Sequence, residues 1–378
     1  MNHEMLPEIK MINKASRDTK SQIVKLGREE IKYIIGTYYD MQDSRVRANN
    51  QSKALDSREK PNELLSWLRD CDQLIEGEIK KTMEHYVKYF DIGIWLNGIM
   101  GIGPVISAGL IAFVDFEKAK TAGNIFRLAD LDPSITWMGA KGAEFEIKKY
   151  KKELGMNEND KIDKGFILGL CNKLKRNPEK FINASNVKND KFSEEKLRKE
   201  LSKPHYNPRF KQICFHIGES VNKQHNRELD LYGKLMQIRK EWHRRKNESG
   251  QCLDQANRLI ENMKPGVYQK DYYPILEKGK VPPWYIHACS KQWATKMFLS
   301  HYHEVGYRLY HKRIPPKPYA TTMEGNHNHY VPPPFFDLNT WEIKKPNKND
   351  VKKCLKNLGG PGMEYHAIAC ELYDDLLK

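Results

Sequence analysis

The segment that most resembles a chemical site is Gly325–Tyr330, which reads Gly-Asn-His-Asn-His-Tyr. Its histidines, His327 and His329, have ring nitrogens of the kind that bind transition metals. Other histidines precede them at His301, His303 and His311. His-Asn-His also spells the HNH nuclease motif, but that motif spreads its residues over a ββα unit, whereas these are consecutive and no Cys-x-x-Cys pair accompanies them. We therefore expect no metal, keep His327 and His329 as weak candidates, and expect them to bond within a Pro-rich loop or to touch RNA.

Adjacent carboxylates occur at several places but make poor acid–base pairs. Glu29 and Glu30 are one example, and Asp374 and Asp375 are another. Neighbouring side chains on a helix point in different directions, so they do not converge on one reacting atom. No Ser/His/Asp or Cys/His arrangement follows from spacing. We expect no catalytic residue and no cofactor.

A glycine-rich turn, Gly98–Val105, lies between two helical patterns. Gly101 and Gly103 permit a tight turn, and Pro104 suits the first turn of a following helix. The unpaired N–H groups at that helix start could hold a phosphate, so backbone contacts are expected at Gly101, Gly103 and Val105. This pattern is typical of a helix-hairpin-helix, although a plain turn between two helices fits it as well. No strand precedes it and no P-loop lysine follows, which excludes a dinucleotide fingerprint.

Positive charge is concentrated in two segments of a chain whose net charge is +15. Residues 203–246 hold 11 Lys and Arg against 4 Asp and Glu, and residues 278–317 hold 8 against Glu304 alone. Such a distribution suits a phosphate backbone, because each neutralised phosphate releases counterions. In the first segment we expect RNA contacts from Lys223, Arg239, Lys240, Arg244, Arg245 and Lys246. Charge reversal at Arg244 and Arg245 should then lower RNA affinity and flatten its salt dependence.

The second basic segment contains a long predicted helix over residues 286–313, ended by Pro315 and Pro316. Basic and aromatic residues recur along it at spacings of three, four and seven, which predicts one face that could contact a nucleic-acid strand by charge and stacking. The contacts expected there are Lys291, Phe298, His301, Arg308 and Lys312. The alternative is an ordinary solvated or partly packed helix face, because the stripe also holds apolar residues.

Composition indicates a foldable, mainly α-helical protein. The chain has 378 residues, 39% of them hydrophobic and 30% charged, and it shows few strand signals. The uncharged stretch 92–114 is long enough to cross a membrane, but five glycines interrupt it, which favours a buried hairpin and no membrane association. Seven scattered cysteines favour reduced thiols in the cytoplasm.

Three regions are expected along the chain. Residues 1–90 form an N-terminal helical element that either dimerises as a coiled coil or packs on its own chain. Residues 91–246 form a helical domain with the glycine turn, within which 148–203 are expected to be exposed helices joined by polar loops. Residues 247–378 form a basic helical region with a Pro/His-rich loop.

Short motifs in the second region resemble known families. Gly101-Ile-Gly-Pro-Val-Ile-Ser-Ala-Gly-Leu resembles the C-terminal helical half of RNA-guided insertion-sequence transposases, and the stretch from Leu128 through Gly139-Ala-Lys-Gly-Ala-Glu-Phe resembles the Nop domain of box C/D RNA scaffold proteins. Pro208-Arg-Phe-Lys-Gln-Ile-Cys-Phe-His resembles a second Nop segment. The family that unites these features is the Tas proteins of TIGR-Tas systems, which are RNA-guided and target DNA. The resemblance implies a Nop-like fold with RNA contacts at Gly139, Ala140, Lys141, Arg209 and Lys211.

Departures from the family narrow the functional expectation. Residues 139–142 read Gly-Ala-Lys-Gly, without the serine nucleophile of the related transposases, and no predicted strand in the N-terminal part carries an aspartate. The resemblance therefore implies a nuclease-lacking member: a homodimeric scaffold, in a prokaryotic cell or infected host, that holds a box C/D-like guide RNA and directs it to target DNA. One alternative is a nuclease or transposase-like enzyme acting on DNA, and another is a helix-hairpin-helix DNA-binding protein without RNA.

Overall fold

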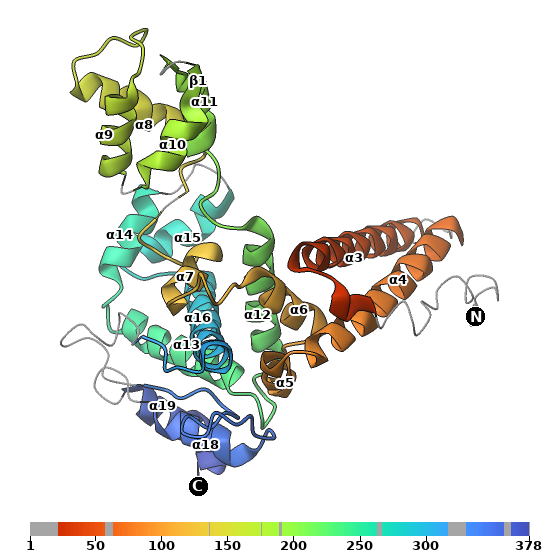
Figure 1. Cartoon of the computed structure of the whole chain (residues 1–378). Helices are drawn as coiled ribbons and strands as arrows, with labels where there is room; N and C mark the ends of the chain where they lie inside the picture. The colour runs from red at the N-terminus through yellow and green to blue at the C-terminus, as the bar shows by residue number, and fades with distance from the viewer. Residues whose placement is uncertain are drawn as a thin grey trace. The chain divides into compact units, whose positions relative to one another are not determined.

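The computed structural model describes residues 22–56, 63–135, 137–174, 176–188, 191–262, 267–316, 330–358 and 364–377 (Figure 1). Within these ranges the protein is mainly α-helical, as predicted, and the only sheet is a two-stranded hairpin. No helix in the described part of the chain is long and apolar enough to cross a membrane.

Contacts divide the chain into two compact units. The small unit is Arg127–Pro208, and the main unit combines Met1–Phe126 with Arg209–Lys378. This division cuts the chain elsewhere than the three predicted regions, whose separate roles stay predictions. The main unit contains η1 (Gln22–Lys25), α3 (Arg28–Asp56), α4 (Glu63–Lys88), α5 (Asp91–Gly98), α6 (Pro104–Phe113), α12 (Pro208–Gln224), α13 (Tyr232–Glu248), α14 (Leu253–Glu261), α15 (Val267–Glu277), α16 (Pro283–His311), α18 (Lys348–Lys356), α19 (Glu364–Leu372) and α20 (Asp374–Leu377), while α7 (Ala122–Leu128) lies across the first boundary.

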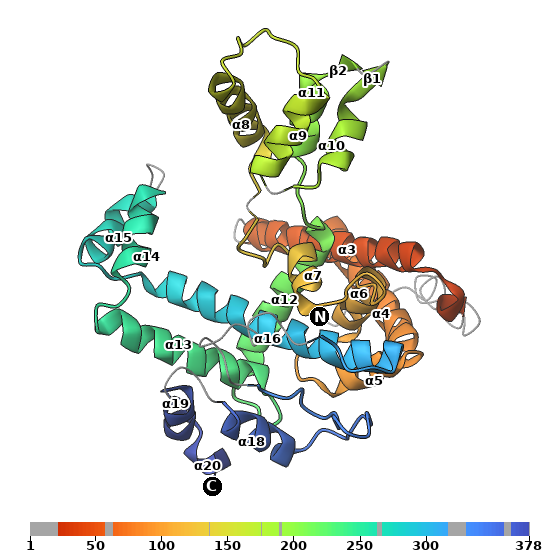
Figure 2. The same cartoon turned by 60° about the vertical axis from the view of Figure 1, so that its left-hand side comes forward.

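Helices α3 and α4 form a long hairpin in the main unit (Figures 1 and 2). Buried Ile31 and Ile35 of α3 and Met83 of α4 belong to its apolar core. Farther along, the Arg45 guanidinium donates to both carboxylate oxygens of Glu76, at 2.6 and 3.3 Å, and so ties the two helices together. In the described residues 22–56 and 63–90, the N-terminal part of the chain is therefore helical, as predicted.

The uncharged stretch 92–114 folds as α5, a turn and α6, as expected of a buried hairpin. Trp95, Leu96, Ala108 and Leu110 are almost completely buried. The Trp95 indole N–H donates to the carbonyl of Pro334 at 2.7 Å, so the single polar atom of this side chain is satisfied inside the core. Figure 2 shows α13 and α16 packed alongside each other, with α19 on α13.

The small unit has a core of its own. It consists of α8 (Gly139–Glu153), α9 (Lys164–Lys173), α10 (Pro178–Ser185), β1 (Asn186–Lys188), β2 (Lys191–Phe192) and α11 (Glu194–Leu201). Ile147, Phe166, Leu170 and Leu197 are buried together. Exposed helices joined by polar loops were expected here, and that expectation was wrong: the charged residues that alternate along 148–203 lie around one apolar core, whose members recur every three or four residues.

Gly93 allows the closest backbone approach at the α4–α5 junction. A Cβ at this position would lie 1.9 Å from the backbone carbonyl oxygen of Val87. We expect Gly93→Ala to lower the free energy of unfolding by about 3 kcal/mol, since backbone has to shift to relieve the overlap. Urea denaturation measures it. Gly77→Ala is the control, because a Cβ on Gly77 in α4 meets nothing within 4 Å, and alanine there should stabilise by about 0.5–1 kcal/mol. Equal midpoints for the two variants would contradict the argument.

Candidate nucleic-acid interface

The turn between α5 and α6 presents an uncapped helix start. Gly101 has a φ of +85°, which favours glycine, and its carbonyl accepts a hydrogen bond of 2.6 Å from the Ser220 hydroxyl. Gly103 is the N-cap of α6 in an extended conformation, and no side chain caps the helix. Pro104 has no N–H. The first backbone N–H of α6 that donates a hydrogen bond to a preceding carbonyl is that of Ser107, which bonds to the Gly103 carbonyl at 2.9 Å. The backbone N–H groups of Val105 and Ile106 therefore remain available at the positive end of the helix dipole.

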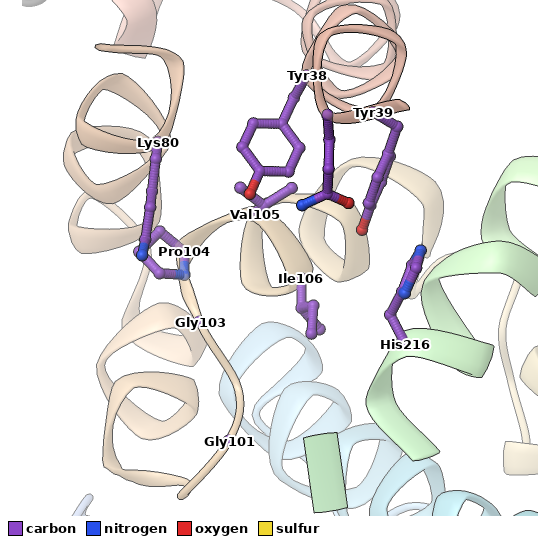
Figure 3. A pocket seen from close by; sticks show the side chains of 10 residues that line it. Tyr38, Tyr39, Lys80, Gly101, Gly103, Pro104, Val105, Ile106 and His216 are labelled. Atoms are coloured by element: carbon purple, nitrogen blue, oxygen red, sulfur yellow. The ribbon is translucent and has the colours of Figure 1, made fainter. Parts of the chain in front are cut away.

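A surface hollow of about 240 Å³ opens at this helix start (Figure 3). Tyr38 and Tyr39 reach it from α3, Lys80 from α4 and His216 from α12. The lining is completed by Gln42, Gly101, Gly103, Pro104, Val105 and Ile106, so none of its residues is acidic. A Cβ on Gly103 would meet nothing within 4 Å, which leaves room beside the backbone N–H groups. An exposed ammonium, a helix N-terminus and hydroxyl donors suit an anion.

The wall of the hollow formed by α3 and α12 is aromatic. Tyr39 and His216 stack with ring centroids 4.9 Å apart and planes 11° from parallel. Burial lowers the pKa of His216, so the ring is neutral at pH 7, and its Nε2 atom has no hydrogen-bond partner among the described residues. Burial, followed by the charge of Glu76, raises the pKa of Tyr38 and keeps its hydroxyl a donor.

The predicted cations of α12 lie on its exposed side. Arg209 is exposed and contacts Asp40 at 3.5 Å and the side-chain oxygen of Gln212 at 3.3 Å. Lys211 and Lys223 are also exposed. Lys223 forms no ion pair with a described residue. It lies two turns of α12 beyond His216, which lines the hollow.

The basic cluster of α13 is largely occupied by other side chains. Arg239 packs over the Trp242 ring at 4.1 Å, and over Trp293 and Tyr365 at 5.7 Å each. Burial lowers the pKa of this guanidinium to about 10, and its Nε atom is buried without a partner in the described structure. The expectation that Arg239 contacts RNA directly is not supported by this packing, because its charged face lies against rings rather than solvent.

The neighbours of Arg239 are more accessible, but two of them are paired. Arg244 and Arg245 are exposed and share Glu241; Arg244 also pairs with Glu248, and Arg245 with Glu371 of α19. Lys246 lies over the Trp242 ring at 4.9 Å, and Lys240 is half-buried. The local carboxylates offset much of the positive charge counted in the sequence, so a phosphate would have to compete with them.

The predicted contact stripe on α16 was wrong for its central residues. Phe298, His301 and Arg308 are buried, with exposed fractions of 0, 3 and 7%. His301 bonds to the Tyr232 hydroxyl and to the Val331 carbonyl, at 2.9 Å each, and Arg308 donates to Glu304 at 2.9 Å. The helix crosses the core of the main unit and is covered on several sides, so a repeat of basic and aromatic residues does not become a surface stripe.

The ends of α16 remain accessible. Lys291 is partly exposed, pairs with Glu219 of α12 and lies 4.7 Å from the Phe215 ring. Burial, followed by the charges of Lys240 and Lys291, lowers the pKa of His287, so a cation of α13 and a cation of α16 both act on this ring. Lys312 is exposed at the C-terminal cap, with a left-handed φ of 51°.

In the small unit, α8 begins at the Gly139-Ala140-Lys141 element. Gly139 has a φ of +64°, and Met138 provides no side-chain cap. Ala140 and Lys141 are exposed, which leaves both free to contact a ligand. By contrast, α9 begins with a capping side chain, since Asp163 accepts from the Phe166 N–H at 2.7 Å.

The metal candidates His327 and His329 lie outside the described residues. Two upstream histidines bond to backbone carbonyls, His303 to Ala119 at 2.8 Å and His311 to Phe116 at 3.0 Å. In the described ranges no group of three or more His, Cys, Asp or Glu side chains could hold a metal ion.

Comparison with protein-family models, with curated proteins and with solved structures gives no match. The hollow at the glycine turn unites predicted Gly101, Gly103 and Val105 with Tyr38, Tyr39, Lys80 and His216, none of which sequence reasoning had selected. Tyr38, Tyr39 and Lys80 belong to no motif, and His216 ends the Nop-like segment Pro208–His216, in which the expected contacts were Arg209 and Lys211.

Proposed function

We propose that this protein is a nucleic-acid-binding scaffold that holds a structured, box C/D-like guide RNA and directs it to target DNA without cutting either. The observation that carries the proposal is the hollow at the start of α6. Its backbone N–H groups and Lys80 offer an anion site with no acidic lining. A chain with a net charge of +15 attracts polyanions, and phosphate is the anionic group of nucleic acid.

The RNA ligand, rather than DNA alone, is supported by the resemblance to Tas proteins and by the small unit. Exposed Lys141 at the start of α8 belongs to the Nop-like motif. Stacked rings beside the hollow of the main unit suit unstacked bases, which are common in folded RNA. A second candidate, a DNA-binding protein without RNA, is favoured by the glycine turn itself, because a helix-hairpin-helix binds a DNA backbone through the same N–H groups.

A homodimer joined through the N-terminal helices forms part of the proposal. Apolar side chains are exposed along α4: Leu64 (63%), Trp67 (48%), Leu68 (40%) and Ile75 (39%). Leu64, Leu68 and Ile75 fall on one helix face. A second copy of the chain would remove this surface from water, which favours association. Light scattering of the Leu68→Glu variant should show a smaller mass than that of the unaltered protein.

The deciding experiment is to purify the full-length protein from cells and analyse the nucleic acid that accompanies it. A discrete short RNA, retained at low salt and released as salt rises, is the expected result. Clean protein that binds only added duplex DNA would support the second candidate instead. Incubation of the RNA-bound protein with magnesium and matching DNA tests the enzymatic alternative, and cleavage would refute the non-catalytic proposal.

A further inference from the structure

A second hollow, of about 300 Å³, lies wholly within the small unit. It is bounded by the segment before α8, by one face of α8 and by the residues that follow α9. The lining residues are Ser134, Ile135, Met138, Gly142, Phe145, Glu146, Leu174 and Arg176. Its volume is at the lower end of the range for small-ligand pockets, and so fits a single ring system rather than an extended molecule.

The walls of this hollow are mainly apolar, and one of them is a ring left open to solvent. Ile135, Met138 and Leu174 provide aliphatic surface. Phe145 is 63% exposed, whereas Ala143, two residues earlier on α8, is buried. The Lys149 ammonium lies 6.0 Å from the Phe145 ring centroid. An exposed aromatic face beside a cation is the surface on which unpaired bases stack.

Two charged side chains that line the same hollow have no polar partner among the described residues. Arg176 makes no side-chain hydrogen bond or ion pair with any residue described, and the same holds for Glu146. Partial burial lowers the pKa of Arg176, which indicates that the guanidinium is partly withdrawn from water. A half-buried cation and a half-buried carboxylate that do not pair with each other leave donors and an acceptor for a ligand between them.

We propose that this hollow binds one unpaired guanine of the bound RNA, with the base stacked on Phe145, Arg176 donating to its O6 and N7, and Glu146 accepting from its N1–H and N2–H. The proposal rests on the RNA-binding function proposed above and names the base that the small unit selects. Guanine has two adjacent donors on one edge and two adjacent acceptors on the next. Uracil has one ring N–H donor, and adenine and cytosine have one exocyclic amine each, so they satisfy the carboxylate less completely.

Other occupants satisfy this set of side chains less well. A phosphate would pair with Arg176 but would be repelled by Glu146. An apolar side chain would fill the hollow and leave both charges desolvated and unpaired, which is costly. A free guanine nucleotide presents the same base as an RNA chain, so the experiment has to distinguish these two sources.

The test measures binding of the full-length, RNA-free protein to two fluorescein-labelled nine-residue RNAs. One is all uridine, and the other has a single guanosine at its centre. We expect the guanosine-containing RNA to bind about tenfold more tightly, in line with one bidentate base contact. Inosine at the same position, which lacks the N2 amine, should lose part of this preference. Glu146→Gln and Arg176→Gln should each abolish most of it, and Phe145→Ala should weaken both RNAs.

Matched controls separate this site from general charge and from folding. Arg198→Gln removes one positive charge from α11 of the same unit, and Phe215→Ala removes an exposed ring (55%) from the main unit. Both should keep the guanosine preference. Because Phe145 is exposed, its alanine variant should fold even if an Arg176 variant does not, and circular dichroism verifies this.

The outcomes distinguish the two proposals. Tight but equal binding of both RNAs would overturn the guanine site and leave the scaffold function standing. If the protein retains no RNA from cells and binds neither of the two added RNAs, the scaffold function is overturned. Binding of 5′-GMP through Glu146 and Arg176, without a preference for guanosine in RNA, would overturn assignment of the hollow to the RNA chain.

Discussion

Replacement of Gly103 by aspartate is expected to weaken RNA binding about tenfold at low salt while leaving the protein at least as stable. Gly103 is the N-cap of α6 and already has the extended backbone that aspartate adopts there, and its Cβ would enter open space. The new carboxylate should cap the free N–H groups, as Asp163 does for α9 at 2.7 Å. Such a cap contributes about 1 kcal/mol to stability. It would also fill the proposed phosphate site with a negative charge.

The Gly103→Asp variant is informative because the same substitution should raise the stability of the protein and lower its affinity for RNA. Thermal unfolding and fluorescence anisotropy against the co-purified RNA measure the two quantities. Gly103→Ser caps without a charge and should weaken binding less. Lys80→Gln tests the other side of the hollow, and should lower the slope of log affinity against log salt by about one. If Gly103→Asp binds RNA as tightly as the unaltered protein at every salt concentration, the start of α6 does not contact phosphate.

Helices were predictable because their signals are local. The spacing of Ile31 and Ile35 marks a buried helix face, and Gly103-Pro104 marks a helix start. The glycine turn with its uncapped start was likewise expected from residue types alone. Each depends on neighbours within a few positions, and a single sequence records these directly.

Exposure was less predictable, as α16 shows. Its repeat of basic and aromatic residues matches a binding stripe, yet Phe298 and His301 are buried. The spacing of residues along a helix shows which of them share a face, but the side chains that cover this face come from elsewhere in the chain. Trp95 stacks on Phe298 from α5, and Val331 accepts from His301. Both ring nitrogens of His301 are satisfied by partners that the spacing along α16 does not reveal.

The count of charged residues in the sequence overestimated the accessible positive surface for a related reason. The positive excess in 203–246 counts only the acids inside that segment. Glu371 neutralises Arg245 across 126 positions, and rings rather than water surround Arg239. The accessible positive surface is therefore smaller than the net charge suggests. Conversely, Tyr38, Lys80 and His216 were not selected because only tertiary packing brings them to one hollow.

Acidification should destabilise the folded protein through His301. Burial lowers the pKa of this imidazole to about 4, against about 6.5 in an unfolded chain. Because the Val331 carbonyl can only accept, Nε2 carries the proton, and Nδ1 accepts from the Tyr232 hydroxyl. A second proton would have to enter at Nδ1, where it would break that bond and place an unpaired charge in the core. Between these two pKa values the unfolded chain binds a proton that the folded protein excludes.

The free energy of unfolding should consequently fall as pH falls through this window, by about 2 kcal/mol from pH 7 to pH 5 for His301 alone. Asp230 acts in the opposite direction, because burial raises the pKa of its carboxyl to about 6 and its neutral form favours the folded state. A comparison of variants isolates the histidine. His301→Gln retains one donor and one acceptor without titrating, so its urea-denaturation free energy should vary less steeply with pH. His85→Gln, at an exposed site on α4, should keep the original slope. Identical slopes for the unaltered protein and His301→Gln would show that His301 is protonated equally in the folded and unfolded states.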